Sequence, residues 1–430
     1  MQLIKLNYKT APSMPLDLVS KNNSLKIKNY TTAHIEQMLD TFKKNLEKYC
    51  GIKSIDPLGK YSQNKFYSIY LTSSNDESNK NLIYGIANSF TSIVKKIPHI
   101  ILCQIDNPTL LQYINFLKKG GNIEIDIIPP NIFGSTIGKT IEKYIKPKTD
   151  EKIQTCMIIA GYVNSSTGSI NNIKKISDIA RKYSIPLHLD CNWAFGYIPI
   201  NPHELGINSL VMDFQYVSGM SNIGLLVVGK DLLDGYQLDR SIQDLNYLPN
   251  MNTKIDPIVL QLATESIKTR YVNRKTKNKK LASLHQLCLK QLKLKYNIVS
   301  LADYISKNNL PADTKNNLSA NTKKKVSKII KLPLIYMGAY SIDQYSTQIP
   351  HIMQFVVPQN KKILVEYKSI ITDYISPEEI TLNTNLYGSL LAKKNISSNI
   401  FLNTISISFS DETTSDDILN FVDYMSKIYN

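Results

Sequence analysis

At 430 residues, with 43% hydrophobic and 20% charged residues, the chain can bury a large core and has the composition of a soluble globular protein. The formal charge of +16 would suit an acidic partner such as nucleic acid, although Lys is abundant throughout a chain that is also rich in Asn and Ile. The five cysteines are scattered and form no CxxC pair, which excludes a disulfide framework. The chain shows no apolar run of membrane-spanning length, and MQLIKLNYKT contains no signal-peptide core, so the sequence predicts a cytoplasmic protein.

The first half of the chain alternates short apolar strands with amphipathic helices. An extended opening segment precedes a helix predicted over 33–49. The pattern then predicts strands over 66–71, 100–104, 123–128 and 155–160, a strand ending at Asp190, and helices over 77–93, 109–119, 137–145 and 170–183. Two further strands surround a loop before Val228. This alternation indicates a largely parallel sheet covered by helices on both faces.

Ligands of such sheets bind where the strands end, at their carboxyl edge. The loops predicted to share that edge follow Leu71, Gln104, Ala160 and Leu189, together with the stretch 213–219.

The pattern changes after about residue 250. Residues 258–295 predict one or two long helices with a strongly basic surface, and KKK at 323–325 continues the trend. Apolar residues keep helical spacing beneath these charges, which favours a solvated helix face over a nucleic-acid stripe. Residues 350–430 predict a compact end domain with strands over 352–357 and 404–409 and a closing helix after DETTSDD.

Several stretches carry a resemblance to a known family. The central stretch TCMIIAGYVNSSTGSINNIKKISDIARKYSIPLHLDCNWAFGYIPINPHELGINSL resembles class V aminotransferases, specifically the NifS/IscS cysteine desulfurases. LTSSNDESN at 71–79 resembles their TSGATESN phosphate loop, IDNP at 105–108 their EHP turn, and NTISISFSDETTSDDI at 403–418 their last strand and helix start. The resemblance covers nearly the whole chain and is weakest from about 260 to 345.

The resemblance implies an α/β fold, the fold type I of enzymes that use pyridoxal 5'-phosphate (PLP). Its large domain contains a mainly parallel seven-stranded sheet, and its small C-terminal domain is α+β. We expect the large domain at 21–262 and the small domain at 1–20 and 263–430. Family members are usually homodimers with the site at the subunit interface, so a homodimer is expected here as well.

The family's Schiff-base lysine lies 26 residues after the aspartate of the central strand, in a Ser-x-His-Lys motif. Counting from Asp190 reaches Tyr216, and Gln215 stands at the preceding histidine position. A phenol cannot replace the amine that holds the aldehyde of PLP. Asp190 alone matches the family and would pair with the pyridinium nitrogen.

The other PLP contacts of the family are replaced as well. Asp76 and Asp213 stand where the family has hydroxyl donors to the phosphate, and two carboxylates would repel a dianion. The ring-stacking histidine corresponds to Asn107, the asparagine at the PLP hydroxyl to Ser165, and the glutamine near the ring to Trp193.

The substrate side of the family's site is equally changed. A desulfurase needs a nucleophilic cysteine on a loop before its last strands, yet no cysteine follows Cys288. The arginine that clamps the substrate carboxylate aligns with Ser406.

Each of these residues also has a purely structural interpretation. Asp190 is about as well explained as a buried acid that backbone donors satisfy, and Trp193 together with Tyr216 is expected to fill the vacated pocket. Cys191 is more readily a buried structural thiol than a nucleophile, and His188 a core residue. The six histidines show no metal-ligand spacing, so no metal is expected.

The leading hypothesis is a NifS-like pseudoenzyme with a structural or interaction role and no cofactor. It resembles the degenerate NifS-like proteins of large DNA viruses, African swine fever virus among them, which implies the host cytoplasm and the virion as locations. One alternative is a PLP-dependent enzyme of this family with an unconventional site that uses Cys191 or Tyr216. Another is a basic nucleic-acid-binding protein using the helices at 258–295 and 322–331.

Overall fold

A computed structural model of the chain describes residues 31–53, 67–103, 107–131, 135–136, 138–165, 167–215, 223–236, 256–301, 303–304, 334–336, 348–356, 366–367, 370–374, 404–409 and 413–429. The predicted opening segment and the loop around Tyr216 lie outside these residues. The chain divides into two compact units, each described by itself. The first contains residues 1–128, 136–163 and 171–275, and the second contains 129–135, 164–170 and 276–430.

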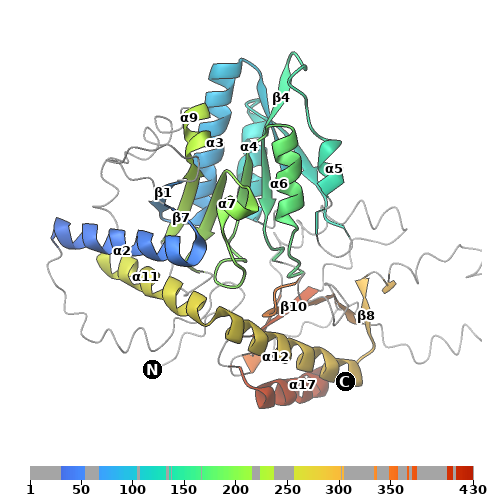
Figure 1. Cartoon of the computed structure of the whole chain (residues 1–430). Helices are drawn as coiled ribbons and strands as arrows, with labels where there is room; N and C mark the ends of the chain where they lie inside the picture. The colour runs from blue at the N-terminus through green and yellow to red at the C-terminus, as the bar shows by residue number, and fades with distance from the viewer. Residues whose placement is uncertain are drawn as a thin grey trace, which may run out of the picture. The chain divides into compact units, whose positions relative to one another are not determined.

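The first unit is built on a seven-stranded sheet (Figure 1). Its strands are β1 (Tyr67–Thr72), β2 (Ile97–Cys103), β3 (Glu124–Ile128), β4 (Ile153–Gly161), β5 (Leu187–Asp190), β6 (Ser209–Asp213) and β7 (Gly224–Gly229). Their order is β1-β7-β6-β5-β4-β2-β3. Only β7 runs antiparallel to its neighbours in this sheet, so the predicted, mainly parallel seven-stranded α/β sheet is confirmed.

Helices cover the sheet. On one face, α3 (Asn75–Val94), α4 (Pro108–Lys119) and α9 (Lys230–Tyr236) share a buried apolar cluster with side chains of β2, β3, β4, β6 and β7. Ile100 and Leu102 point into this cluster, while Ile101 between them is equally buried, because successive strand residues face opposite sides of a sheet. Both faces of β2 are therefore covered, as the continuous apolar strands of the sequence predicted.

The remaining helices of this unit pack in pairs. Helix α2 (Thr32–Cys50) packs against α11 (Pro257–Val272). Helix α6 (Ile173–Lys182) packs against both α5 (Gly138–Glu142) and α7 (Pro202–Leu205). Helix α5 covers five residues of the predicted nine, 137–145. Phe214, at the end of β6, packs on Phe42 of α2 and Phe195, with ring centroids 5.8 and 5.3 Å away.

The second unit contains a six-stranded sheet in the order β11-β12-β13-β10-β9-β8. Its strands are β8 (Ile298–Ser300), β9 (Leu334–Tyr336), β10 (Ile352–Val356), β11 (Glu366–Tyr367), β12 (Ile370–Tyr374) and β13 (Thr404–Ser408). The long helices of this part of the chain are α12 (Arg274–Lys295) and α17 (Ser415–Tyr429), whose side chains Lys295 and Asp423 form an ion pair. The predicted domain limits of 21–262 and of 1–20 with 263–430 stay a prediction.

The helices that the structure describes were also compared with the length and hydropathy that crossing a lipid bilayer requires. Within the described ranges, none is both long and apolar enough.

Candidate functional site

The ends of three strands place the candidate site at the carboxyl edge of the seven-stranded sheet. Thr72 of β1 and Asp213 of β6 both pair with Gly224 of β7, and Asp190 is the last residue of β5. Thr72, Asp190 and Asp213 therefore lie on the predicted rim, where the neighbouring strands β5 and β6 bring the two aspartates together, whereas Gln104 and residues 216–219 of that rim lie outside the described residues.

Gly224 allows the β1–α3 loop to reach this edge. A Cβ atom added to Gly224 would lie 2.5 Å from the carbonyl carbon of Ser74. Because this distance is shorter than a van der Waals contact, the position requires a residue without a side chain. Ser74 is the N-cap of α3, and its hydroxyl accepts a hydrogen bond from the Glu77 backbone N–H at 3.1 Å. The sequence signal Ser-x-x-Glu at this helix start is of the capping-box type.

The first turn of α3 is closed by a carboxylate from another strand. The backbone N–H of Asn75 donates to Oδ2 of Asp213 at 3.1 Å, and the N–H of Gln215 donates to Oδ1 of the same carboxylate at 2.8 Å. Helix N-termini carry free N–H donors and a partial positive charge, so they favour anions. Asp213 supplies that anion from within the protein.

Asp190 is held by two donors. Its Oδ1 accepts from the Asn192 backbone N–H at 3.0 Å, and its Oδ2 accepts from Nδ2 of Asn75 at 3.2 Å. Burial raises the pKa of Asp190 to about 6, with a further upward contribution from the charge of Asp76, while hydrogen bonds, those from Asn192 and Asn75 foremost, lower it. Burial also raises the pKa of Asp213, and Asp76 again adds to the effect.

A buried chain of hydrogen bonds runs to Asp190 from the sheet. Nδ2 of Asn79 donates to Oδ1 of Asn75 at 3.0 Å, so Oδ1 of Asn79 faces Nε2 of His188 at 3.0 Å. Burial lowers the pKa of His188 to about 3, so its ring is neutral and carries one proton. That proton must be on Nε2, and Nδ1 then accepts from the Ser209 hydroxyl at 2.8 Å.

This series of hydrogen bonds fixes the orientation of the amide groups of Asn79 and Asn75, and each group in it donates toward Asp190. The expected core position of His188 is confirmed, because the residue is fully buried. The sequence interpretation did not single out Asn75 and Asn79. Their spacing of four residues at the start of a helix, both on one face, was the available signal.

Asp76 lies beside this cluster, in the first turn of α3. Its Oδ1 accepts from Nδ2 of Asn107 at 2.9 Å, while Oδ1 of Asn107 caps α4 by accepting from the Leu110 N–H at 3.0 Å. Asn107 thus has a structural role at the helix start, which its position before Pro108 could have indicated.

The other predicted site residues are distributed as follows. Trp193 is half-buried in the turn after β5, and Ser165 is buried in the second unit, within residues 164–170. Tyr216 lies outside the described residues, so the prediction that it and Trp193 fill a pocket stays a prediction. No group of three His, Cys, Asp or Glu side chains in the described ranges is arranged to hold a metal ion.

Comparison with known proteins decides the family. The model of the family "Aminotransferase class-V" matches residues 19–241, which is more than half of the chain. The chain belongs to the class-V aminotransferase family. The matched stretch includes α3, β5 and β6, and therefore every carboxylate of the site described above.

Curated relatives of this chain are named as cysteine desulfurases. The chain is 26% identical over 189 residues to a "Putative cysteine desulfurase NifS" of Bacillus subtilis, covering 44% of each chain. It is 30% identical over 162 residues to a "Cysteine desulfurase IscS" of Dictyoglomus turgidum, covering 38% of this chain and 39% of the relative. The matches span less than half the length of these curated relatives.

Solved structures extend the likeness of the fold to the whole chain. A "NIFS-LIKE PROTEIN" superimposes with a TM-score of 0.65 at 13% identity, covering 98% of both chains. A NifS-like protein from Rickettsia africae superimposes with a TM-score of 0.63 at 15% identity, covering 100% of this chain and 99% of the other. PLP fold type I is thereby confirmed.

The expectation that no cofactor belongs to this protein is contradicted. The class-V family model and the cysteine desulfurase relatives point to PLP as the cofactor of the scaffold. The expectation was wrong because it treated the replacement of contact residues as equivalent to the absence of binding.

The described residues fit the ring of PLP but not its phosphate. Near the predicted ring position, Asp190 can accept from a protonated nitrogen, and Oδ1 of Asn192 is a buried acceptor without a hydrogen-bond partner among the described residues. At the start of α3, Asp213 already occupies the Asn75 N–H, and Asp76 adds a second carboxylate. This end does not fit a dianionic phosphate, so we derive no reaction step through the cofactor.

Proposed function

We propose that this chain is a NifS-like protein without cysteine desulfurase activity, whose scaffold serves a structural or interaction role. The state of its cysteines is the observation that carries this proposal. The chain has five, Cys50, Cys103, Cys156, Cys191 and Cys288, and all are free and buried. Removing sulfur from cysteine onto the protein requires an accessible thiolate, which none of the five offers.

The pKa values of the thiols point in the same direction. Burial raises the pKa of Cys50 and of Cys156 to about 12, and it raises those of the other three thiols as well. Cys191 beside Asp190 is shifted further by that carboxylate's charge. A thiol in such a setting is a poor nucleophile near neutral pH.

The family resemblance adds independent support. Tyr216 stands at the position of the Schiff-base lysine, and Ser406 at that of the arginine that clamps the substrate carboxylate. The two carboxylates at the start of α3 oppose the phosphate that the family binds there.

A second candidate function is a PLP-dependent enzyme of this family with an unconventional site. The pair of acceptors at Asp190 and Asn192 favours it, because both could face a ring nitrogen or another donor of a bound cofactor.

Sulfide release from L-cysteine tests the leading proposal. We expect the full chain, incubated with PLP and a reductant, to release no more sulfide than PLP alone, because no thiolate can reach the substrate. The Bacillus subtilis NifS relative, assayed in parallel, is the positive control. Repeated turnover that persists in Cys191→Ala would show an unconventional enzyme, and turnover abolished by that substitution would identify Cys191 as the nucleophile; either result would end the proposal.

Thiol titration tests the structural basis of the same proposal. We expect none of the five cysteines of the native chain to react with Ellman's reagent within minutes at pH 8, and all five to react in guanidinium chloride. A rapidly reacting native thiol would contradict the assigned burial, and Cys→Ala variants would identify which residue is exposed.

Several finer expectations from the resemblance stay proposals. They are a homodimer, a cytoplasmic location, and an origin in a large DNA virus with packaging into the virion. The domain limits at 262 and 263 belong with them.

A further inference from the structure

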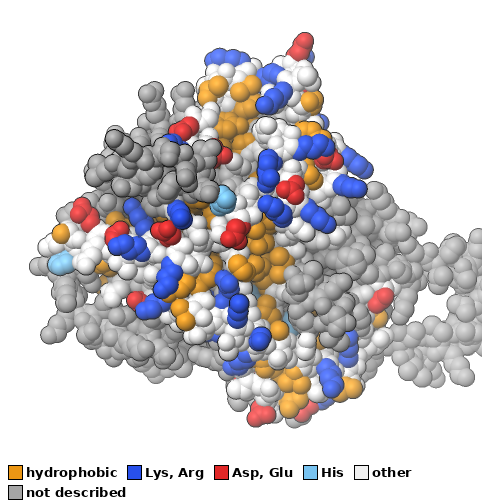
Figure 2. Space-filling view, viewed as in Figure 1, with side chains coloured by type: hydrophobic (Ala, Val, Ile, Leu, Met, Phe, Trp, Pro, Cys, Tyr) orange, Lys and Arg blue, Asp and Glu red, His pale blue; other side chains and the backbone are white. Residues whose placement is uncertain are grey.

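Two neighbouring helices of the first unit, α3 and α4, leave aromatic side chains on the surface. Phe116 of α4 is 70% exposed, and Tyr84 of α3 is 42% exposed. Among the aromatic side chains that the structure describes, the third exposed one is Tyr183, just after α6, at 36%. Figure 2 shows hydrophobic side chains on the surface at the position that α3 and α4 occupy in Figure 1. Exposed aromatic area that is gathered on one surface indicates a contact site.

Tyr113 of α4 connects the two exposed rings. It lies half-buried one turn before Phe116, and burial together with the neighbouring Tyr84 hydroxyl raises its pKa. Nζ of Lys80, one turn before Tyr84 on α3, lies 5.9 Å from the centre of the Tyr113 ring. Residues three or four apart on a helix share a face, so these side chains form one strip across both helices.

The charges on this strip are mainly positive. Neither α4 nor residues 78–94 of α3 contain Asp or Glu, and the acids of α3 are confined to its first turn. Lys118 and Lys119 are exposed in the last turn of α4, close to Phe116, and Lys118 pairs with Glu124 of β3 at 3.7 Å. We call the set the α3–α4 surface; it consists of Lys80, Tyr84, Tyr113, Phe116, Lys118 and Lys119.

Polar amides stand beside the exposed rings. Asn88 follows Tyr84 by one turn of α3, and Gln112 precedes Phe116 by one turn of α4; both are exposed. An amide both donates and accepts hydrogen bonds, so it can meet the edge of a nucleobase. Insertion of the same surface into lipid would instead remove water from these amides.

We propose that the α3–α4 surface binds single-stranded nucleic acid without sequence preference. Bases stack on Phe116 and Tyr84, and the lysines of the surface contact the phosphates. Bases in a duplex are already stacked on one another, so a duplex offers the rings no partner. A second copy of this chain fits less well, because a two-fold contact would bring lysines toward lysines. This proposal is independent of whether the chain desulfurates cysteine.

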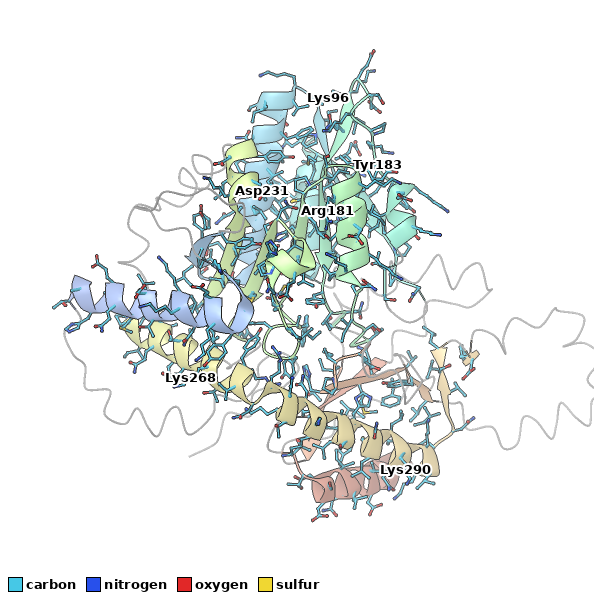
Figure 3. The ribbon with its side chains drawn as sticks, viewed as in Figure 1. Lys96, Arg181, Tyr183, Asp231, Lys268 and Lys290 are labelled. Atoms are coloured by element: carbon cyan, nitrogen blue, oxygen red, sulfur yellow. The ribbon has the colours of Figure 1, made fainter. Side chains whose placement is uncertain are left out.

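Fluorescence anisotropy of the full chain with a labelled 12-nucleotide oligothymidylate tests the stacking. We expect Phe116→Ala to weaken binding at 50 mM salt at least fivefold, because one stacking platform is lost. Phe116→Trp, which keeps an aromatic ring, should bind within twofold of the unmodified chain. The matched control is Tyr183→Ala, at the exposed aromatic residue that Figure 3 labels after α6, and it should change the affinity less than twofold.

The same assay tests the phosphate contacts. Binding by the unmodified chain should weaken about 20-fold from 50 to 200 mM salt, as release of counterions by about three lysines from a single strand requires. Lys118→Ala with Lys119→Ala should weaken binding at 50 mM at least fivefold and flatten the salt dependence. The matched control is Lys174→Ala with Lys175→Ala, two adjacent exposed lysines on α6, and it should weaken binding less than twofold.

Four results would overturn the proposal, with circular dichroism establishing that every variant is folded. No binding at 50 mM salt, or equal losses in Phe116→Ala and Tyr183→Ala, would remove the stacking surface. Equal affinity for a 12-base-pair duplex would show attraction by charge alone. Binding to vesicles of phosphatidylserine and phosphatidylcholine that Phe116→Ala abolishes would reassign the surface to a membrane and equally refute a nucleic-acid site.

Discussion

Replacing Asp76 by Thr and Asp213 by Ser is expected to tighten binding of pyridoxamine 5'-phosphate at least tenfold at pH 8, while the affinity for pyridoxamine changes less than twofold. Both carboxylates lie at the start of α3, and Asp213 accepts the Asn75 N–H that a phosphate would use. Two unit charges about 8 Å apart interact with about 2 kcal/mol at an effective dielectric constant of 20. Removing two carboxylates near a dianion therefore exceeds the 1.4 kcal/mol that a tenfold change requires.

The choice of ligands isolates the phosphate. Pyridoxamine 5'-phosphate is the amine form of the cofactor and has no aldehyde that could react with surface lysines. Pyridoxamine has the same ring without the phosphate, so a gain restricted to the phosphorylated ligand locates the effect at the start of α3. Asp178→Ser, at an exposed residue of α6 that pairs with Arg181, is the matched control and should leave both affinities unchanged.

The opposite result would have a clear meaning. An equal gain for both ligands, or none for either, would show that the phosphate does not bind beside Asp76 and Asp213. The sequence-based alignment of these residues with the phosphate contacts of the family would then be wrong.

The sequence predicts the strands and helices around the site well, because their apolar periodicity is local. The strand ending at Asp190 and the helix after Thr72 were both expected, the latter from residue 77, whereas α3 begins at Asn75. The error of two residues matters here. Asn75 provides both the N–H that binds Asp213 and the amide that binds Asp190.

The contacts within the site could not be predicted in the same way. Asp213 and Asn75 are 138 residues apart. Nothing in the local sequence indicates that the Asp213 carboxylate accepts a hydrogen bond from the first turn of the helix that Asn75 begins. The same holds for the chain from His188 through Asn79, which joins a strand to a helix across 109 residues. Such pairings depend on strand order, which a single sequence does not reveal.

The second large effect concerns stability and pH. Burial raises the pKa of Asp190 from its ordinary value of 3.8 to about 6, so the folded chain binds this proton more tightly than the unfolded chain does. The free energy of unfolding must therefore fall as pH rises from about 4 to above about 6. The full effect is about 3 kcal/mol, of which about 2 kcal/mol falls between pH 4.5 and pH 8.

Residue 190 cannot titrate in Asp190→Asn. The free energy of unfolding of this variant minus that of the unmodified chain is therefore expected to be about 2 kcal/mol larger at pH 8 than at pH 4.5. Urea unfolding followed by circular dichroism at both pH values measures this difference. The loss of a hydrogen-bond acceptor in the variant affects both measurements alike and cancels in the comparison. Asp178→Asn should show no such change, because its carboxylate is exposed.

A difference that does not depend on pH would show that Asp190 ionises at its ordinary pKa, and the burial argument would fail. A difference of the expected size would mean that the scaffold maintains an energetically costly, half-buried carboxylate at neutral pH. Asn75, Asn192 and the hydrogen-bond chain from His188 would then serve to hold a charge that destabilises the folded chain. Such a cost is typical of a residue retained to meet a cationic or donor group of a ligand, which links the pH measurement to the binding experiment with pyridoxamine 5'-phosphate.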